Sequence, residues 1–150
     1  MEEWMRLALA EAKKAALLGE LPIGAAIVKE GRLIAAAGNA REALHDPSAH
    51  AEILALRAAG RLLGDWRLDG CELYATLEPC AMCAAAVQQA RLKRVVFGAF
   101  DEEKGACGSV YALPSDDRLG RPVEVVGGLL RGECEAPLRA FFAKSRAKNE

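Results

Sequence analysis

Apolar and polar positions alternate along the chain with two different periods. Residues 2 to 18 carry apolar side chains at mixed spacings of three and four, with Glu and Lys between them and Gly19 after them, which predicts a helix. Residues 23 to 28 and 32 to 37 have the pattern of two short strands, and Glu30-Gly31 between them favours a tight turn. The chain is therefore expected to open with a helix and a hairpin.

The rest of the chain alternates predicted helices and strands. One helix is expected to start after Asp46-Pro47-Ser48 and to close at Gly60, and another to open at Pro79 and run to about Arg91. Pro137 is tolerated in the first turn of a helix, so the last helix should start near Cys134 or Glu135, or be kinked there. The remaining strands and this last helix are expected at 71 to 77, 94 to 99, 123 to 127 and about 134 to 147. This order predicts one α/β domain over residues 1 to 150, a mixed sheet with helices on both faces.

Composition narrows the class of protein. A chain of 150 residues with 52% hydrophobic and 27% charged residues and a mean hydropathy of +0.05 has the balance of a single globular domain, which excludes a disordered chain and a membrane protein. Its 20 basic and 21 acidic residues give a net charge of -1, which excludes a uniformly basic nucleic-acid binder. A polyanionic partner must therefore meet a local patch.

The cysteines and the N-terminal residues indicate a reducing compartment. The five cysteines are an odd number, and the start of the chain, MEEWMRLALAEAKK, is acidic where a signal peptide is basic. Both features argue against secretion and against a disulfide framework. No apolar run reaches the roughly 18 residues that a membrane span requires. We expect a cytoplasmic protein in which Cys71, Cys107 and Cys134 are buried small apolar side chains.

Two short motifs carry the candidate chemistry, and each opens a predicted helix. The first is His50-Ala51-Glu52, and the second begins at Pro79 and contains Cys80 and Cys83. The two cysteines are three residues apart, so their sulfur atoms share one helix face, and a helix N-terminus favours the thiolate form that binds metal. Together with His50 they make a Cys₂His set suited to zinc. Three protein ligands leave the fourth tetrahedral position open, which is the arrangement of catalytic zinc.

Glu52 has the position of a base rather than of a ligand. Two successive steps of about 100° put His50 and Glu52 on nearly opposite sides of a helix, so they cannot both bind the metal from one helix face. With His50 at the helix edge, Glu52 can approach a water on the metal, whose pKa zinc lowers from about 15.7 to roughly 7. H-x-E combined with P-C-x-x-C is the signature of zinc-dependent nucleobase deaminases.

Other interpretations of these residues remain open at this point. A CxxC pair alone is also a redox motif, and a histidine alone is more often a satisfied core residue. His45 and His50 with Cys80 and Cys83 would close a structural Cys₂His₂ site, although that arrangement leaves Glu52 without a purpose. A zinc-stabilised RNA-binding module without chemistry is a further possibility.

Longer strings in the sequence resemble one family. HDPSAHAEILALR, LYATLEPCAMCAAA, RVVFGAFDEEKGACGS and ECEAPLRAFF are similar, in register over nearly the whole chain, to the bacterial tRNA-specific adenosine deaminases. The resemblance implies the cytidine-deaminase-like fold, a three-layer α/β/α sandwich around a mixed five-stranded sheet, with one zinc ion per subunit. It also implies a homodimer that converts adenosine to inosine at the wobble position (34) of tRNA-Arg(ACG), bound through its anticodon stem-loop. HxE and PCxxC alone would equally fit a guanine or cytosine/cytidine deaminase acting on a free base or nucleoside.

The resemblance also assigns roles to individual residues. It implies that His50, Cys80 and Cys83 bind zinc and that Glu52 is the proton shuttle. Two further assignments follow from position: Asn39, which lies 11 residues before His50, would orient the adenine, and Asp101 would stand at the edge of the nucleotide pocket. A turn residue and a loop-starting acceptor are the simpler interpretations of these two.

The end of the chain resembles the RNA-facing C-terminal helix of that family. Its aromatic pair and its three basic residues are Phe141, Phe142, Lys144, Arg146 and Lys148. A solvated basic helix end is an equally fair interpretation of the charges, because cations are expected near a helix C-terminus.

Overall fold

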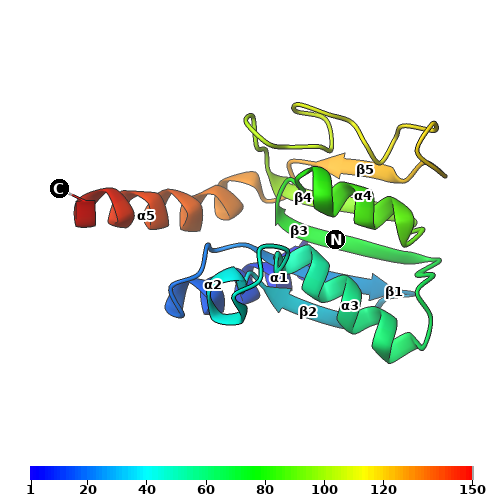
Figure 1. Cartoon of the computed structure of the whole chain (residues 1–150), viewed down its shortest axis with the longest axis horizontal. Helices are drawn as coiled ribbons and strands as arrows, with labels where there is room; N and C mark the ends of the chain where they lie inside the picture. Colours follow the sequence, from blue (N-terminus) through cyan, green and yellow to red (C-terminus); the bar gives the residue numbers. More distant parts are fainter. Residues whose placement is uncertain (150) are drawn as a thin grey trace.

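A five-stranded mixed sheet forms the centre of the molecule, as predicted. The computed structural model describes residues 1–149. In the sheet, β1 lies between β2 and β3 and is antiparallel to both, while β3, β4 and β5 are parallel, which gives the order β2-β1-β3-β4-β5 (Figure 1). The strands are β1 (Gly24–Lys29), β2 (Arg32–Gly38), β3 (Cys71–Leu77), β4 (Arg94–Ala99) and β5 (Glu124–Gly127).

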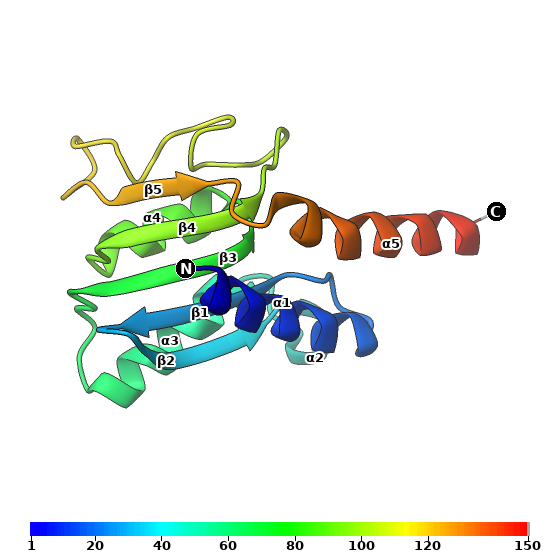
Figure 2. The same cartoon turned by 180° about the vertical axis from the view of Figure 1, so that it is seen from behind.

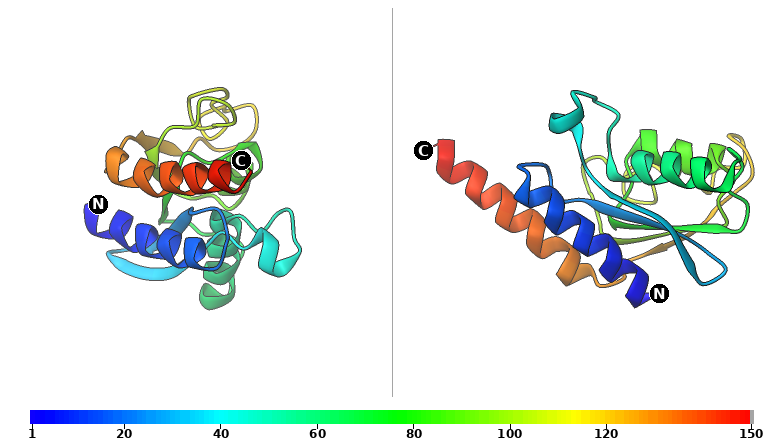
Figure 3. Two further views of the ribbon diagram at one scale, coloured as in Figure 1. Left: turned by 90° about the vertical axis from the view of Figure 1, so that its left-hand side faces the viewer. Right: turned by 90° about the horizontal axis from the view of Figure 1, so that it is seen from below.

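Helices cover both faces of this sheet and confirm the three-layer α/β/α arrangement. Helices α1 (Glu2–Leu17) and α5 (Arg131–Asn149) lie on one face, and α3 (Ala51–Leu63) and α4 (Ala81–Gln89) lie on the other (Figures 2 and 3). Two clusters of buried apolar residues fill the two spaces between the layers. Among residues 1–149, no helix combines the length and the apolar composition needed to cross a membrane.

The strand directions bring several chain connections to one edge of the sheet. Because β1 is antiparallel to both of its neighbours, β2 runs in the same direction as β3 and β4, and these strands end at the same edge (Figure 1). Asn39 follows β2, Pro79-Cys80 follow β3, and Asp101 follows β4 by one residue. The residues singled out in the sequence thus leave the sheet on one side, as expected for a site in an α/β fold.

The hairpin agrees with its predicted position. Glu30 and Gly31 both have positive φ, 49° and 71°, which is the backbone of a type I′ turn. Helix α3 differs from its prediction, because it continues through Gly60 to Leu63 and has Gly64 as its C-cap residue. Gly64 takes the left-handed conformation (φ 69°), which glycine adopts without steric cost and which ends helices commonly. The short helix α2 (Arg41–Leu44), between β2 and α3, was not predicted.

The last helix also starts earlier than predicted, at Arg131, so that Pro137 is its seventh residue rather than part of its first turn. The first turns are held by packing. Cys134 is 1% exposed, and a Cβ on Gly98 of β4 would lie 2.2 Å from its sulfur, so helix and strand approach closely at this point. Pro137 removes one intrahelical hydrogen bond, to the carbonyl of Glu133.

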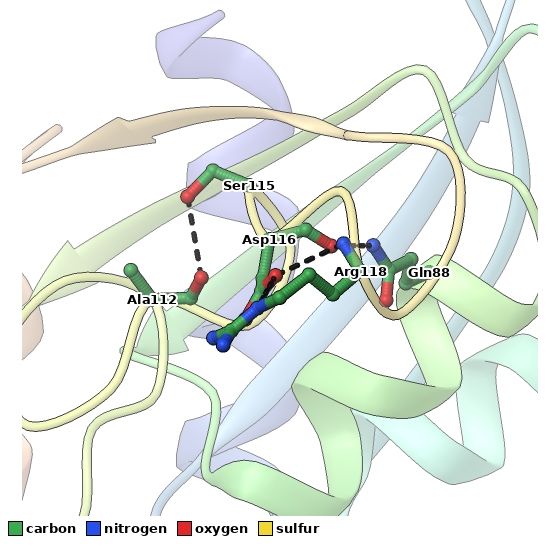
Figure 4. Close-up of polar contacts among 5 residues, drawn as sticks. All are labelled: Gln88, Ala112, Ser115, Asp116 and Arg118. Carbon is green, nitrogen blue, oxygen red and sulfur yellow. Dashed lines mark hydrogen bonds and ion pairs between the residues drawn. The ribbon is translucent and has the colours of Figure 1, made fainter.

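Hydrogen bonds from α4 hold the long connection between β4 and β5. The Gln88 side chain is 4% exposed, and its amide nitrogen donates to the carbonyl oxygens of Asp116 (3.1 Å) and Arg121 (3.5 Å). Within the loop, Arg118 bonds to the Asp116 carboxylate and the Ser115 hydroxyl donates to the Ala112 carbonyl (Figure 4). The five cysteines are free thiols, and Cys71, Cys107 and Cys134 are buried as predicted.

Candidate active site

Two helix N-termini meet at the edge where the strands end. His50 is the N-cap residue of α3 and Cys80 is the N-cap residue of α4, and both have extended backbones (ψ 150° and 177°). Cys83 is the third residue of α4 and is fully buried. An N-cap residue stands just outside its helix, so both side chains are free to turn toward each other across the gap between the two helices.

The three side chains form a compact group of metal ligands. His50 Nδ1 lies 3.6 Å from Cys80 Sγ and 3.5 Å from Cys83 Sγ, and the three ligand atoms lie within 4.8 Å of one another. Zinc binds sulfur at about 2.3 Å and imidazole nitrogen at about 2.0 Å, which at tetrahedral angles puts sulfur and nitrogen about 3.6 Å apart. The donor set and its spacing therefore fit a zinc ion.

The electrostatics of the two thiols favour a thiolate. A hydrogen bond from the Cys83 thiol lowers the pKa of Cys80 to about 3, and the contact with His50 acts in the same direction against the effect of burial. The same contact with Cys80, together with burial, raises the pKa of Cys83. In the metal-free pair the proton therefore stays on Cys83 and Cys80 is the thiolate, which is the form that binds metal.

Glu52 lies beside this group without belonging to it. It is the second residue of α3 and is 4% exposed. Burial is the main reason why the pKa of its carboxyl is raised; the Cys80 sulfur adds to the rise, and His50 and the Cys83 thiol oppose it. Among residues 1–149, the group of possible metal ligands consists of His50, Cys80 and Cys83, so it does not include His45. His45 is the C-cap residue of α2, with φ 50°.

Asn39 and Asp101 lie at the same sheet edge and outside the ligand group. Asn39 is 5% exposed, and its backbone N–H donates to the Ile23 carbonyl (3.0 Å). Asp101 Oδ1 accepts the N–H groups of Glu103 and Lys104, both at 3.1 Å. Asp101 therefore has the loop-starting role that was one of the two interpretations of its sequence position.

Two buried carboxylates near the site were not singled out from the sequence. Glu20 is 2% exposed and accepts the N–H groups of Glu42 (3.1 Å) and Ala43 (2.8 Å), which fixes the start of α2. Glu78 is also 2% exposed and holds the loop that follows β4. Glu20 and Glu78 each lie within two residues of a proline and close to an apolar strand. That combination is the sequence signal that could have indicated a buried carboxylate.

A groove runs between α5 and the start of the β4–β5 loop. It has a volume of about 690 Å³. Phe100 and Phe142 are 40% and 47% exposed, and the Arg131 guanidinium lies 5.0 Å from the centre of the Phe100 ring. Exposed aromatic rings next to basic side chains are typical of single-stranded nucleic-acid binding surfaces. Its other lining residues include Asp101, Glu102, Glu103, Lys104, Glu135 and Leu138.

A second, larger groove separates α3 from α4 on the outer face of the molecule. It measures about 830 Å³ and is lined mainly by apolar side chains. Trp66, which lines this groove, is 57% exposed, and the guanidinium groups of Arg67 and Arg91 lie 4.5 Å and 5.3 Å from the centre of its ring. The candidate metal ligands lie at the N-terminal ends of the same two helices, so the groove and the candidate metal site share α3 and α4.

Residues 1–99 match the family model "Cytidine and deoxycytidylate deaminase zinc-binding region". This match and the His/Cys/Cys group together identify the cofactor as one zinc ion per chain. The tRNA-specific adenosine deaminase of Bacillus subtilis is 48% identical over 149 residues, which covers 99% of this chain and 92% of that protein.

Solved structures show the same fold. One, from a study of A-to-I editing by tRNA:A34 deaminases at the wobble position of transfer RNA, superposes with a TM-score of 0.89 at 43% identity and covers 92% of this chain and 100% of that one. A guanine deaminase from Nitrosomonas europaea superposes with a TM-score of 0.80 at 31% identity, over 95% of this chain and 84% of that one.

Proposed function

Because this chain belongs to the cytidine and deoxycytidylate deaminase family and, within it, to the tRNA-specific adenosine deaminases, we propose that it converts adenosine to inosine at position 34 of tRNA-Arg(ACG). The reaction adds one water to the adenine ring and releases ammonia, so a C6–O bond forms and the C6–N bond to the amino group breaks. With tRNA as its substrate, the reaction would take place in the cytoplasm.

The observation that carries the proposal is a three-ligand metal group beside a buried carboxylate. His50, Cys80 and Cys83 would hold the zinc, and three protein ligands leave one of four positions open. Zinc bound there supplies Lewis-acid activation of water at neutral pH. A structural site would use a fourth protein ligand instead, and the ligand group of the described chain includes neither Glu52 nor a second histidine.

Glu52 would move the protons. Its carboxylate would take one proton from the attacking water and deliver it to the ring nitrogen next to C6. It would then take the remaining proton from the new C6 hydroxyl and deliver it to the amino group, which leaves as ammonia while C6 becomes a carbonyl. A general acid–base group of this kind must lie within hydrogen-bond reach of the reacting atoms. The first turn of α3 holds Glu52 next to the ligand atoms and away from bulk water, which suits the role.

The substrate would enter from the edge of the sheet where β2, β3 and β4 end. Asn39 lies at this edge and would orient the adenine. The groove along α5 offers the rings of Phe100 and Phe142 for stacking flanking bases, and Lys104 and Arg131 are its cations among four carboxylates. A loop base suits such a pocket, because flipping it out costs much less than unpairing a duplex base. The near-zero net charge of the chain fits a shaped pocket with a small basic rim.

The competing function is deamination of a free purine, which the similarity to a guanine deaminase favours. Incubating the zinc-loaded protein with an ACG anticodon stem-loop, and in parallel with free adenosine, guanine and cytidine, separates the two. We expect inosine and ammonia from the stem-loop alone, measured by nucleoside chromatography and ammonia release. Turnover of a free base or nucleoside without stem-loop activity would replace the proposal by the competing one, and zinc binding without turnover would indicate an RNA-binding module.

A homodimer is the second part of the proposal, and the α3–α4 groove is the surface that supports it. Its lining is apolar, and the exposed side chain of Trp66 extends the apolar surface. Apolar surface of this extent on a soluble domain favours contact with another protein surface. We assign the groove to a second copy of the chain, which would bring the two metal groups close to the shared interface.

Replacing Trp66 by Glu is expected to shift the protein from a dimer to the 16.0 kDa monomer, because it puts a charge into the apolar contact. Light scattering coupled to gel filtration measures the mass. Leu17→Glu is the matched control, since Leu17 is 87% exposed on α1 on the opposite face of the sheet, and it should leave the mass unchanged. A Trp66→Glu variant with the wild-type dimer mass would rule out this interface.

A further inference from the structure

One buried carboxylate connects the ligand-bearing helix to the loop at the pocket rim. Glu78 lies between the last residue of β3 and Pro79, two residues before Cys80. Its Oε1 accepts the backbone N–H of Asp101 (3.1 Å), and its Oε2 accepts those of Cys107 (3.1 Å) and Ser109 (3.0 Å). The Ser109 hydroxyl also donates to Oε1. Four donors therefore converge on one side chain that is 2% exposed.

The loop wraps tightly around this carboxylate. A Cβ on Gly105 would lie 2.3 Å from Glu78 Cδ and 2.4 Å from the Asp101 carbonyl oxygen, so the backbone passes against the carboxyl group where only a glycine fits. The Gly105 N–H donates to the Asp101 carbonyl (2.9 Å), and the Ala106 N–H donates to the Pro79 carbonyl (2.9 Å). The segment from Asp101 to Ser109 is thus fixed to the chain just before Cys80.

The acceptor has to be a carboxylate. All four partners of Glu78 are donors, and an ionised carboxylate offers acceptor sites only. Hydrogen bonds to a charged acceptor are stronger than those between neutral groups. An amide of the same size would turn its NH2 group toward at least one backbone N–H, that of Asp101 or those of Cys107 and Ser109, and the loop would have to move away.

We propose that Glu78 is a positioning residue for the deaminase reaction, which holds the 101–109 loop against the ligand-bearing start of α4 and thereby sets the rim of the substrate pocket. This rests on the proposed function, because Asp101 and Lys104 line the groove assigned to the RNA. Glu78 is not one of the metal ligands. Its loss should therefore weaken substrate binding while zinc and Glu52 stay in place.

The test is Glu78→Gln with two matched controls. The variant should keep one zinc per chain, raise KM for the ACG stem-loop about tenfold or more, and leave kcat close to the wild-type value, because loss of hydrogen bonds to a charged group has an effect of that order. Asp117→Asn makes the same chemical change on an exposed carboxylate of the β4–β5 connection that does not line the groove, and it should behave as wild type. Ser109→Ala removes one of the four donors and should have a smaller effect than Glu78→Gln.

Hydrogen exchange gives a readout that does not depend on the proposed activity. Amides of residues 101 to 109 should exchange roughly tenfold faster in Glu78→Gln, while those of α3 and β3 keep their protection. Gly105→Ala pushes the loop away from Glu78 and leaves the Glu78 carboxylate unchanged. It should therefore reproduce both the rise in KM and the faster exchange. If Glu78→Gln does not fold, this variant tests the proposal in its place.

Native KM and native exchange in the folded variants would overturn the proposal, as would a rise in KM that merely follows loss of zinc. An inactive wild-type protein would contradict the proposed function instead, while the exchange of the loop would still test the role of Glu78.

Discussion

Glu52→Gln is expected to abolish inosine formation, with kcat lowered about a thousandfold, while the protein keeps its fold and its zinc. General acid–base groups contribute about 10² to 10⁴ in rate, and Glu52 would act in both proton transfers of this reaction. The amide of Gln has nearly the same volume, so the variant leaves no cavity beside the ligand group. Single-turnover assays on the ACG stem-loop, with zinc measured by atomic emission on the same sample, test the expectation.

Glu2→Gln provides the matched control, because Glu2 is an exposed carboxylate in the first turn of α1. It should leave both rate and zinc content unchanged. A Glu52→Gln variant that forms inosine at the wild-type rate would exclude Glu52 as the proton shuttle. A variant that loses its zinc would instead assign Glu52 a role in holding the ligand group together.

His50→Ala is expected to remove the zinc and all activity. The imidazole Nδ1 would be the one nitrogen ligand and stands 3.6 and 3.5 Å from the two sulfur atoms, so its loss would leave two ligands where catalytic sites use three. Metal binding is coupled to folding, so the melting temperature of the variant should also fall to that of the wild type treated with a chelator. Zinc content after dialysis and thermal unfolding measure both effects.

His45→Ala is the matched control for that experiment. His45 ends α2, and the ligand group formed by the described chain does not include it, so this variant should keep one zinc per chain and full activity. Loss of zinc from a folded His45→Ala variant would indicate a closed Cys₂His₂ site and would contradict an open coordination position.

The strands and the positions of the candidate metal ligands could be predicted because their signals are local. The segments 71 to 77 and 94 to 99 are short apolar runs, and both coincide with β3 and β4. His50 and Cys80 stand at helix starts that Ser48 and Pro79 mark in the sequence, and the structure makes both of them N-cap residues. Local signals of this kind do not depend on where the rest of the chain lies.

The features that could not be predicted depend on contacts between distant residues. Helix α5 packs on the sheet through Cys134 and Gly98, a contact across 36 positions, and it accommodates Pro137 in its interior although the local signal of Pro137 favours a later start. Glu78 acquires its partners from a loop more than 20 residues away. An isolated Glu in a sequence is normally a solvated side chain, and only the fold makes it a buried acceptor.

The strand order has a consequence for how copies of this chain can meet. The outer strands β2 and β5 have unpaired edges, and such edges invite pairing with another chain and aggregation. Here β5 has four residues and follows Pro122, and the β1–β2 pairing contains an irregularity between Ile27 and Val28. Short strands and bulges discourage a continuous intermolecular sheet. The sheet edges are therefore poor surfaces for self-association, and the dimer proposed above would use a helical surface, where a symmetric pair closes instead of growing into a fibre.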